Sequence, residues 1–414
     1  MTAPAYTPAH LNGALRGRGN YLPPVPVKRR WRDVVRIWWS EIDKLLLLLI
    51  TVLMGIGIIA VAAASPASAD QLSTAKVTLD EFLFFKRHIV FQLMGLALMV
   101  GLSFLSRDAA RRLGILVGAI MLALMFLVPI IGEEKNGARR WINIGMSLQP
   151  SEFLKPGFAI ICAWILSWRL RDPGLPVIIY VSGLMGLIAV LLMAQPNLGD
   201  AILFAGIWLV MVLLAGIPWQ RIAAMGGLGI AALGLAYVFY DNARHRIDGF
   251  LGGGTAFDQV DLAQRTLLAG GWTGSGLWLG IRKMNLPEAH TDYIFSVIGE
   301  EFGLITCAII ALLYCALVLR ALLRMVHEDN LFALLAVVGL ITQFGGQAFI
   351  NMLVNLELFP SKGMTLPLIS YGGSSTLAVC FTLGLLLAIS RRNPFLAREG
   401  GGLRGLIERK EDRA

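Results

Sequence analysis

Long uncharged stretches separated by short polar ones run through most of this chain and are its clearest structural signal. The stretch from Leu45 to Ala64 carries no charged residue, and about 20 such residues suffice to cross the apolar core of a bilayer as an α-helix. Comparable stretches predict ten membrane-spanning helices, at residues 44–64, 87–105, 113–131, 150–168, 175–194, 200–216, 223–240, 297–319, 331–353 and 374–390. The predicted fold class is therefore an all-α, polytopic membrane protein.

Basic residues between the predicted spans decide the orientation. Arginines follow spans two, four, six, eight and ten, on the same side as a basic N-terminal segment; they are Arg107, Arg111, Arg112, Arg169, Arg171, Arg221, Arg320, Arg324, Arg391 and Arg392. Because membrane proteins retain Lys and Arg on the cytoplasmic side, both termini are predicted to be cytoplasmic. The predicted organisation is an N-terminal tail at 1–43, a membrane domain at 44–395 and a C-terminal tail at 396–414.

The longer loops then lie on the periplasmic side. The loop between spans seven and eight, at 241–296, is unusually long for a connection without a domain of its own, and loops of this length are more often functional or disordered. It is rich in glycine but also contains Phe, Trp and Leu, so we expect a folded loop that lies against the membrane.

Composition excludes several classes of protein. With 56% hydrophobic and 15% charged residues, the chain cannot be an ordinary soluble globular protein. The net charge of +9 is scattered between apolar spans, which argues against nucleic-acid binding. All cysteines lie in apolar segments without zinc-site spacing, and we expect neither a disulfide nor a zinc site; they are Cys162, Cys307, Cys315 and Cys380.

Cations in the outer loops run against the charge rule and invite an explanation. They include Arg139, Arg140, Arg244 and Arg246. Two interpretations remain open: these side chains pair with nearby Asp residues, or they form a positive face that holds an anionic headgroup such as a pyrophosphate.

Polar segments at the outer ends of spans four and six are the first candidates for a site. Glu152 and Lys155 would lie on one face of a helix as an ion pair, and Ser151 fits an N-cap. A cap with a stabilising pair and a functional membrane cavity are equally good interpretations. In the segment 195–200 we favour a plain turn in which Asp200 caps span six.

Two further polar segments lie at the outer ends of spans eight and ten. His290, Thr291 and Asp292 open span eight directly after the long loop. From the residues alone, a capping role for Thr291 or Asp292 is favoured over a catalytic carboxylate. The segment 360–375, which contains Lys362 and Ser370, is either a hairpin loop or a stretch that folds back between helices.

These segments, in this order and spacing, resemble the SEDS family of shape, elongation, division and sporulation proteins. The similar motifs are G-A-R-R-W-I, Q-P-S-E-F-L-K, Q-P-N-L-G-D, P-E-A-H-T-D-Y-I-F-S-V-I-G-E-E-F-G and P-L-I-S-Y-G-G-S-S. The segment 360–367 is more similar to the division (FtsW-like) branch than to the elongation (RodA-like) branch. Two positions depart from the family pattern: Asn197 stands where an acidic residue is common, and Glu357 replaces a usual glycine.

The resemblance implies a peptidoglycan glycosyltransferase of the inner membrane that polymerises lipid II at the division septum. It also implies a class B penicillin-binding protein and other divisome proteins as partners, in contact with membrane lipids. By residue match, Asp292 corresponds to the family's catalytic aspartate, and Glu152 and Lys155 correspond to residues of its central cavity.

The implied chemistry needs a base and a set of cations. A sugar hydroxyl is a poor nucleophile and needs a base within hydrogen-bond reach, and the resemblance implies that Asp292 has this role. A single displacement inverts the anomeric centre. Cations stabilise the departing pyrophosphate, and the candidate binding residues are Arg139, Arg140, Lys155, Arg244, Arg246, His290, Lys362 and Ser370. A bridging Mg²⁺ or Mn²⁺ fits this chemistry, although the sequence shows no clear set of ligands.

Other functions fit the same spans. A lipid II transporter would also need charges within the membrane, but the chain lacks the matching broken spans that mark inverted repeats. A membrane scaffold without activity and an elongation-type polymerase are the further alternatives.

Overall fold

The computed structural model describes residues 31–73, 78–135, 138–143, 145, 147–170, 172, 174–216, 219–239, 259–360 and 363–392. The chain divides into two compact units, residues 1–40 and 41–414. The first unit contains most of helix α1 (Trp31–Glu41), whose exposed side chains include Trp31, Val35 and Trp39. The predicted tail boundaries after residues 43 and 395 stay predictions.

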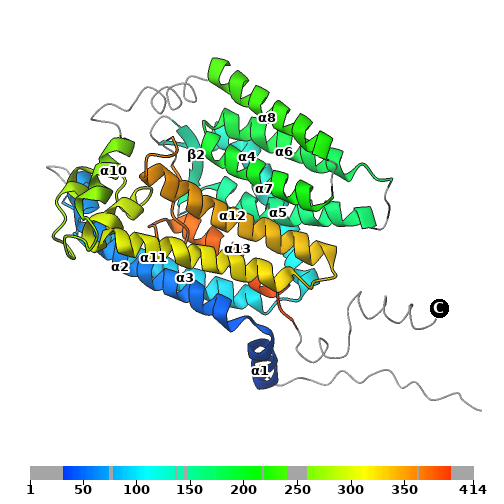
Figure 1. Ribbon diagram of the computed structural model, residues 1–414, viewed down its shortest axis with the longest axis horizontal. Helices are drawn as coiled ribbons and strands as arrows, with labels where there is room; N and C mark the ends of the chain where they lie inside the picture. The colour runs from blue at the N-terminus through cyan, green and yellow to red at the C-terminus, as the bar shows by residue number, and fades with distance from the viewer. Residues whose placement is uncertain are drawn as a thin grey trace, which may run out of the picture. The chain divides into compact units, whose positions relative to one another are not determined.

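The second unit is a bundle of apolar helices, as predicted (Figure 1). Among the described residues, seven helices are long and apolar enough to cross a membrane: α2 (Lys44–Leu72), α3 (Leu83–Ser103), α4 (Arg107–Ile131), α5 (Pro150–Ser167), α6 (Val177–Ala194), α11 (Ile294–Met325) and α12 (Leu331–Asn355). The apolar helices α7 (Leu198–Leu214) and α13 (Gly373–Ile389) are shorter, and α8 (Trp219–Phe239) follows α7. Each predicted span overlaps one of these helices; that all ten cross the membrane stays a prediction.

Helix α5 lies inside the bundle and packs against α4, α7, α12 and α13. Glycines make this possible: a Cβ on Gly157 would collide with the backbone of Gly118 in α4. Close backbone approach of this kind is typical of helix packing in membranes. It buries one whole side of α5, including Glu152 and Lys155.

A small antiparallel sheet follows α4. It consists of β1 (Glu133–Lys135), β2 (Ala138–Asn143) and β3 (Ser147–Leu148), with β2 in the middle. The sheet leads directly into α5, so that residues of the hairpin lie at the same end of the bundle as the start of α11 (Figure 1).

Ion pairs hold the helices together at the opposite end. Asp43 caps α2 by accepting from the Leu46 N–H at 3.0 Å, and it pairs with Arg320 and Arg324 of α11 at 2.9 and 3.0 Å. Burial raises the pKa of Asp43, but the hydrogen bonds and the arginines outweigh it and leave the pKa below its usual value. This pairing sets the start of α2 level with the end of α11.

The long loop is folded over its described part, residues 259–293, and residues 240–258 lie outside the described part of the chain. It contains α10 (Gln259–Ala269) and the 3₁₀ helix η2 (Arg282–Asn285). Helix α11 is broken at Gly303, where φ is 82°. A Cβ at this position would collide with the Trp272 carbonyl oxygen, so the loop and the broken helix lie backbone against backbone.

Candidate active site

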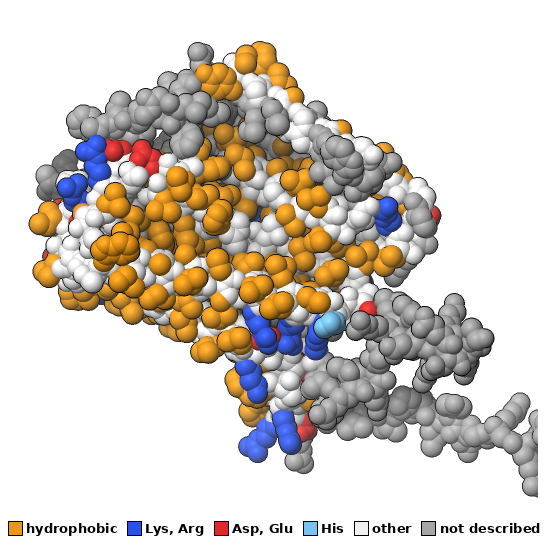
Figure 2. All heavy atoms as spheres, viewed as in Figure 1, with side chains coloured by type: hydrophobic (Ala, Val, Ile, Leu, Met, Phe, Trp, Pro, Cys, Tyr) orange, Lys and Arg blue, Asp and Glu red, His pale blue; other side chains and the backbone are white. Residues whose placement is uncertain are grey.

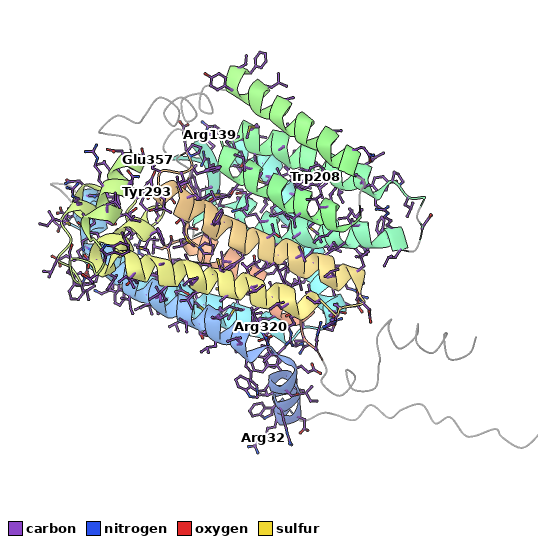
Figure 3. The ribbon with its side chains drawn as sticks, viewed as in Figure 1. Arg32, Arg139, Trp208, Tyr293, Arg320 and Glu357 are labelled. Carbon is purple, nitrogen blue, oxygen red and sulfur yellow. The ribbon has the colours of Figure 1, made fainter. Side chains whose placement is uncertain are left out.

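A polar cavity of about 1260 Å³ opens at the hairpin end of the bundle. Figure 3 shows Tyr293, from its wall, at the same end of the bundle as Arg139 and Glu357, with Arg320 at the other end. The wall comes from α3, the β2–β3 hairpin, the segment before α11 and the segment 363–375. Its described charged residues are Lys86, Arg87, Arg140, Glu288 and Asp292.

Asp292 is a half-buried residue of the cavity wall, just before the start of α11. Its backbone carbonyl accepts hydrogen bonds from the Asn351 and Asn355 side chains of α12, at 2.8 and 3.2 Å. Helix α11 has Tyr293 as its N-cap residue, whose side chain makes no capping bond, and the Ser296 N–H of the first turn donates to Asn355 Oδ1 at 3.1 Å instead. The favoured interpretation that Thr291 or Asp292 caps this helix is therefore wrong; these contacts instead hold the Asp292 backbone at the cavity.

Arg140 faces the same part of the cavity as Asp292. Its Nε donates to the Gln195 carbonyl at 3.0 Å, and its Nη2 donates to the Pro196 carbonyl. A Cβ added at Gly363 would lie 3.4 Å from Asp292 Oδ2 and 4.0 Å from Arg140 Nη1. A carboxylate and a guanidinium thus both lie within van der Waals reach of one position in the cavity wall.

A buried ionic cluster lies beneath the cavity. The ammonium of Lys155 is fully buried and bonds Glu152 at 2.8 Å and Asp200 at 2.9 Å. The predicted pair of Glu152 and Lys155 is confirmed, but two capping predictions are wrong. Asn197 caps α7, not Asp200, and Ser151 donates to Asp200 at 2.7 Å instead of capping α5.

Hydroxyl groups connect this cluster to the cavity wall. Ser375 lines the cavity and donates to Glu152 Oε2 at 3.5 Å, while its oxygen lies 2.7 Å from that of Thr365, which also lines the cavity. Gln347 of α12 bonds both the Thr365 carbonyl, at 3.0 Å, and Lys155, at 3.4 Å. The cluster therefore supports the cavity floor instead of facing the open space.

Two other predicted site residues lie behind the wall. Ser370 donates to the Thr291 carbonyl at 2.6 Å and accepts from the Leu366 N–H. His290 is buried against Phe84 and Tyr371, and burial lowers its pKa to about 4. Both residues shape the segment that carries Asp292, and at neutral pH the imidazole of His290 is uncharged.

The remaining predicted cations divide into two groups. Arg139 points away from the described cavity wall and bonds Glu134 at 3.4 Å. Arg244, Arg246 and Lys362 lie outside the residues that the structure describes. Sequence reasoning missed Lys86 and Arg87, although they too are outer cations next to a span and the same charge rule could have found them.

The described residues do not offer a complete metal site. No group of three or more His, Cys, Asp or Glu residues among them could hold a metal ion. Glu288 and Asp292 are the carboxylates in the described part of the cavity wall, and Glu288 accepts a hydrogen bond from Thr291 at 2.8 Å. The described carboxylates therefore do not form a binding site for Mg²⁺ or Mn²⁺.

Comparison with known proteins decides the family. The family model described as "Cell cycle protein", which is named for FtsW, RodA and SpoVE, matches residues 43–394. The chain belongs to the SEDS family. It is a multi-pass protein of the inner membrane.

Relatives of this SEDS protein agree with that assignment. The chain is 35% identical over 365 residues to a protein of Caulobacter vibrioides named "Probable peptidoglycan glycosyltransferase FtsW", covering 88% of this chain and 93% of the relative. It is 37% identical to a protein of the same name from Halorhodospira halophila, covering 84% and 90%.

Two solved structures share the fold. One is described as "Structural coordination of polymerization and crosslinking by a peptidoglycan synthase complex"; it has a TM-score of 0.68 at 28% identity and covers 85% of this chain and 98% of its own. The other is the rod shape determining protein RodA of Thermus thermophilus, with a TM-score of 0.62 at 27% identity, covering 85% and 97%.

Proposed function

We propose that this SEDS protein polymerises lipid II into glycan strands, with Asp292 as the general base. The observation that carries the proposal is the approach of Asp292 and Arg140 to the same position, Gly363, in a large polar cavity. A base must reach the hydroxyl proton of the acceptor sugar, and a cation must face the departing pyrophosphate. The pair supplies both groups within one site.

The chemistry is a single displacement. Asp292 takes the proton of the acceptor sugar's hydroxyl group while the oxygen of that hydroxyl attacks the anomeric carbon of the donor. The bond from this carbon to the lipid pyrophosphate breaks, and the anomeric centre is inverted. Arg140 stabilises the negative charge that develops on the pyrophosphate. Arg87, in the wall formed by α3, supplies further positive charge, and Lys86 beside it is paired with Asp80 at 2.5 Å. Because both substrates carry lipid tails, a cavity at the end of a membrane bundle suits them.

The relatives' printed names support the substrate class and the division branch. Septal wall synthesis is accordingly the proposed setting, with elongation-type synthesis as the alternative. Restoration of septation in cells depleted of their own division-type protein would support the first setting. Restoration of rod shape alone, in cells depleted of the elongation-type protein, would support the second.

The proposed orientation places the termini in the cytoplasm and the cavity at the periplasmic face. It is supported by the arginines at the far end of the bundle from Asp292, of which Arg320 is labelled in Figure 3. A cysteine placed at the exposed Glu134 should react with an impermeant reagent in intact spheroplasts. Reaction of that cysteine only after the membrane is opened would contradict the proposed orientation and indicate the opposite one.

The proposed partner is a class B penicillin-binding protein that cross-links the strands. An apolar groove of about 720 Å³ lies between α11 and α12, and its lining includes the small residues Ala308, Ala311, Gly345 and Gly346. Hydrophobic side chains cover this face of the bundle in Figure 2. Small residues allow a further membrane helix to pack closely, and we place the partner's membrane helix here.

A pair of neighbouring variants tests this contact. Ala311→Trp would fill the groove and should abolish co-purification with the partner. Leu312→Trp changes a lipid-exposed neighbour that is not part of the groove lining, and it should leave co-purification intact. Equal co-purification of both variants would contradict the placement.

Purified protein separates the polymerase from a lipid II transporter. With its cross-linking partner and lipid II, the wild-type protein should yield glycan polymer, and Asp292→Asn should reduce the rate about 10²–10⁴-fold. A transporter would move lipid II across vesicles and yield no polymer. A scaffold would do neither, and both outcomes would refute the proposal.

A further inference from the structure

The extracytoplasmic loop carries an exposed apolar patch that the proposed reaction does not use. We define the 268–284 patch by its exposed apolar side chains: Leu268, Trp272, Leu277, Trp278, Leu279, Ile281 and Met284. Trp272 and Ile281 are the most open, at 72% and 77% exposure. An exposed apolar surface of this kind marks a contact with lipid or with protein.

The patch is fixed to two membrane helices, so its depth can be measured along them. Trp278 Nε1 donates to the Ala62 carbonyl of α2 at 3.2 Å, and Lys283 Nζ donates to the Ala63 carbonyl at 2.8 Å. In Figure 1 the yellow-green loop segments lie beside the ends of α2 and α11. The patch therefore cannot move far from α2 without losing these two hydrogen bonds, of which the one from Lys283 is buried.

The break in α11 provides the second attachment. The N–H groups of Leu304 and Ile305, which follow Gly303, donate to the Gly271 and Trp272 carbonyls at 3.0 and 3.3 Å. The loop thus satisfies donors that the broken helix leaves without an intrahelical partner. The Glu300 carboxylate accepts from two backbone N–H groups of η2, which joins the other half of the patch to α11.

Both attachments lie near the same depth, within about one helical turn of each other. At a helical rise of about 1.5 Å per residue, Ala62 lies about 27 Å along α2 from Lys44, and Gly303 lies about 33 Å along α11 from Met325. The Asp43–Arg324 ion pair sets these two starting points level. The hydrocarbon core of a bilayer is about 30 Å thick, so both attachments lie where its far boundary meets the headgroups.

From this geometry we propose that the 268–284 patch is seated in the headgroup region of the outer leaflet, with phospholipid as its occupant. Trp side chains are enriched at this depth because the ring is apolar and its N–H is polar. A soluble protein domain would have to displace lipid to reach the patch, which argues for lipid over protein. This contact with the headgroups would hold the segment before α11 at a constant depth in the membrane.

Site-specific quenching in lipid nanodiscs tests the depth without any turnover. Cys315→Ala removes the exposed cysteine, and the other cysteines are buried. In that background a nitrobenzoxadiazole label is attached at Ile281→Cys. A label at Glu134→Cys, on the exposed hairpin, reports water, and a label at Leu312→Cys, in the lipid-facing part of α11, reports the bilayer interior.

The label at Ile281 should be quenched most by a phospholipid with a shallow doxyl group. Quenching by aqueous iodide should be severalfold weaker than at Glu134, and quenching by a deep doxyl group should be weaker than at Leu312. Iodide quenching equal to that at Glu134, with no doxyl quenching, would overturn the proposal. Protection from iodide that appears only after the cross-linking partner is added would also overturn it and assign the patch to protein. Neither result depends on whether the protein polymerises lipid II.

Discussion

Replacing Lys155 by methionine should destabilise the whole bundle. The ammonium is fully buried and neutralises two carboxylates, Glu152 at 2.8 Å and Asp200 at 2.9 Å. Methionine has a similar volume and would leave both carboxylates facing each other without a cation. Breaking a buried ion pair by removing one partner costs about 3–5 kcal/mol, which should lower the apparent melting temperature by several degrees.

The two carboxylates should not be equivalent. Asp200 also accepts hydrogen bonds from Ser151 at 2.7 Å and Asn197 at 2.8 Å, whereas Glu152 has a weaker second contact with Ser375. After Glu152→Gln, Lys155 keeps Asp200 as a charged partner, so the loss should be smaller, about 1–2 kcal/mol. The expected order of loss is Lys155→Met, then Asp200→Asn, then Glu152→Gln.

The buried cysteines supply the assay. Cys162, Cys307 and Cys380 are buried and Cys315 is exposed. On heating, a thiol-reactive fluorophore labels the three buried cysteines only as the protein unfolds, and labelling of Cys315 gives a constant baseline signal. Lys155→Met combined with Asp200→Asn removes one of the opposed carboxylates and should melt above Lys155→Met alone. A melting temperature of Lys155→Met equal to that of the wild type would refute the account of the cluster.

Three further predictions concern the loop and the cavity wall. Asn351→Ala should slow polymer formation about tenfold or more, because the Asp292 carbonyl then keeps only the longer bond from Asn355 and the Met364 carbonyl loses the bond from Asn351. A lost bond of this kind costs about 1–3 kcal/mol and lets the Asp292 backbone shift. Gly303→Ala should fail to accumulate in membranes, since the new Cβ would collide with the Trp272 carbonyl at a φ of 82°. Burial lowers the pKa of His290 from 6.5 to about 4. Between these two pH values the unfolded chain binds a proton at His290 and the folded protein does not, so the stability of the folded protein declines as the pH falls from 6.5 toward 4. His290→Gln should therefore flatten the dependence of melting temperature on pH in this range.

Matched variants control these experiments. Gln343→Ala removes an amide from the same helix as Asn351, but its side chain bonds Thr382 and is not part of the described cavity wall; polymer formation should stay near the wild-type rate. Gly186→Ala places a Cβ in open space within α6, and it should accumulate normally. Equal loss in a variant and its control would contradict the corresponding prediction.

The helices could be predicted from the sequence because long apolar stretches without charges have few other stable conformations. The ion pair of Glu152 and Lys155 could also be predicted, since a spacing of three residues on a helix brings side chains together. The break at Gly303 could not be predicted, because the neighbouring residues continue the helical pattern and only the contact with the loop makes the break favourable.

The partners of the polar residues depended on tertiary packing. Both Asn197 and Asp200 are good caps, and only the approach of α5 gives Asp200 a buried lysine instead. Arg139 and Arg140 were predicted as equivalent cations, although neighbouring residues on a strand point to opposite faces. Arg140 therefore faces the cavity and Arg139 faces Glu134, which could have been predicted only with the strand already assigned.

The most direct measurement compares the two carboxylates of the described cavity wall in one assay. Asp292→Asn and Glu288→Gln each remove one negative charge with little change in shape, and polymer formation from lipid II is measured in proteoliposomes that contain the cross-linking partner. The account predicts that Asp292→Asn loses about 10²–10⁴-fold in rate at a normal protein level, while Glu288→Gln, whose carboxylate contacts Thr291, stays within about threefold of the wild type. A near-normal rate for well-folded Asp292→Asn, or an equal loss in both variants, would contradict the assignment of Asp292 as the base.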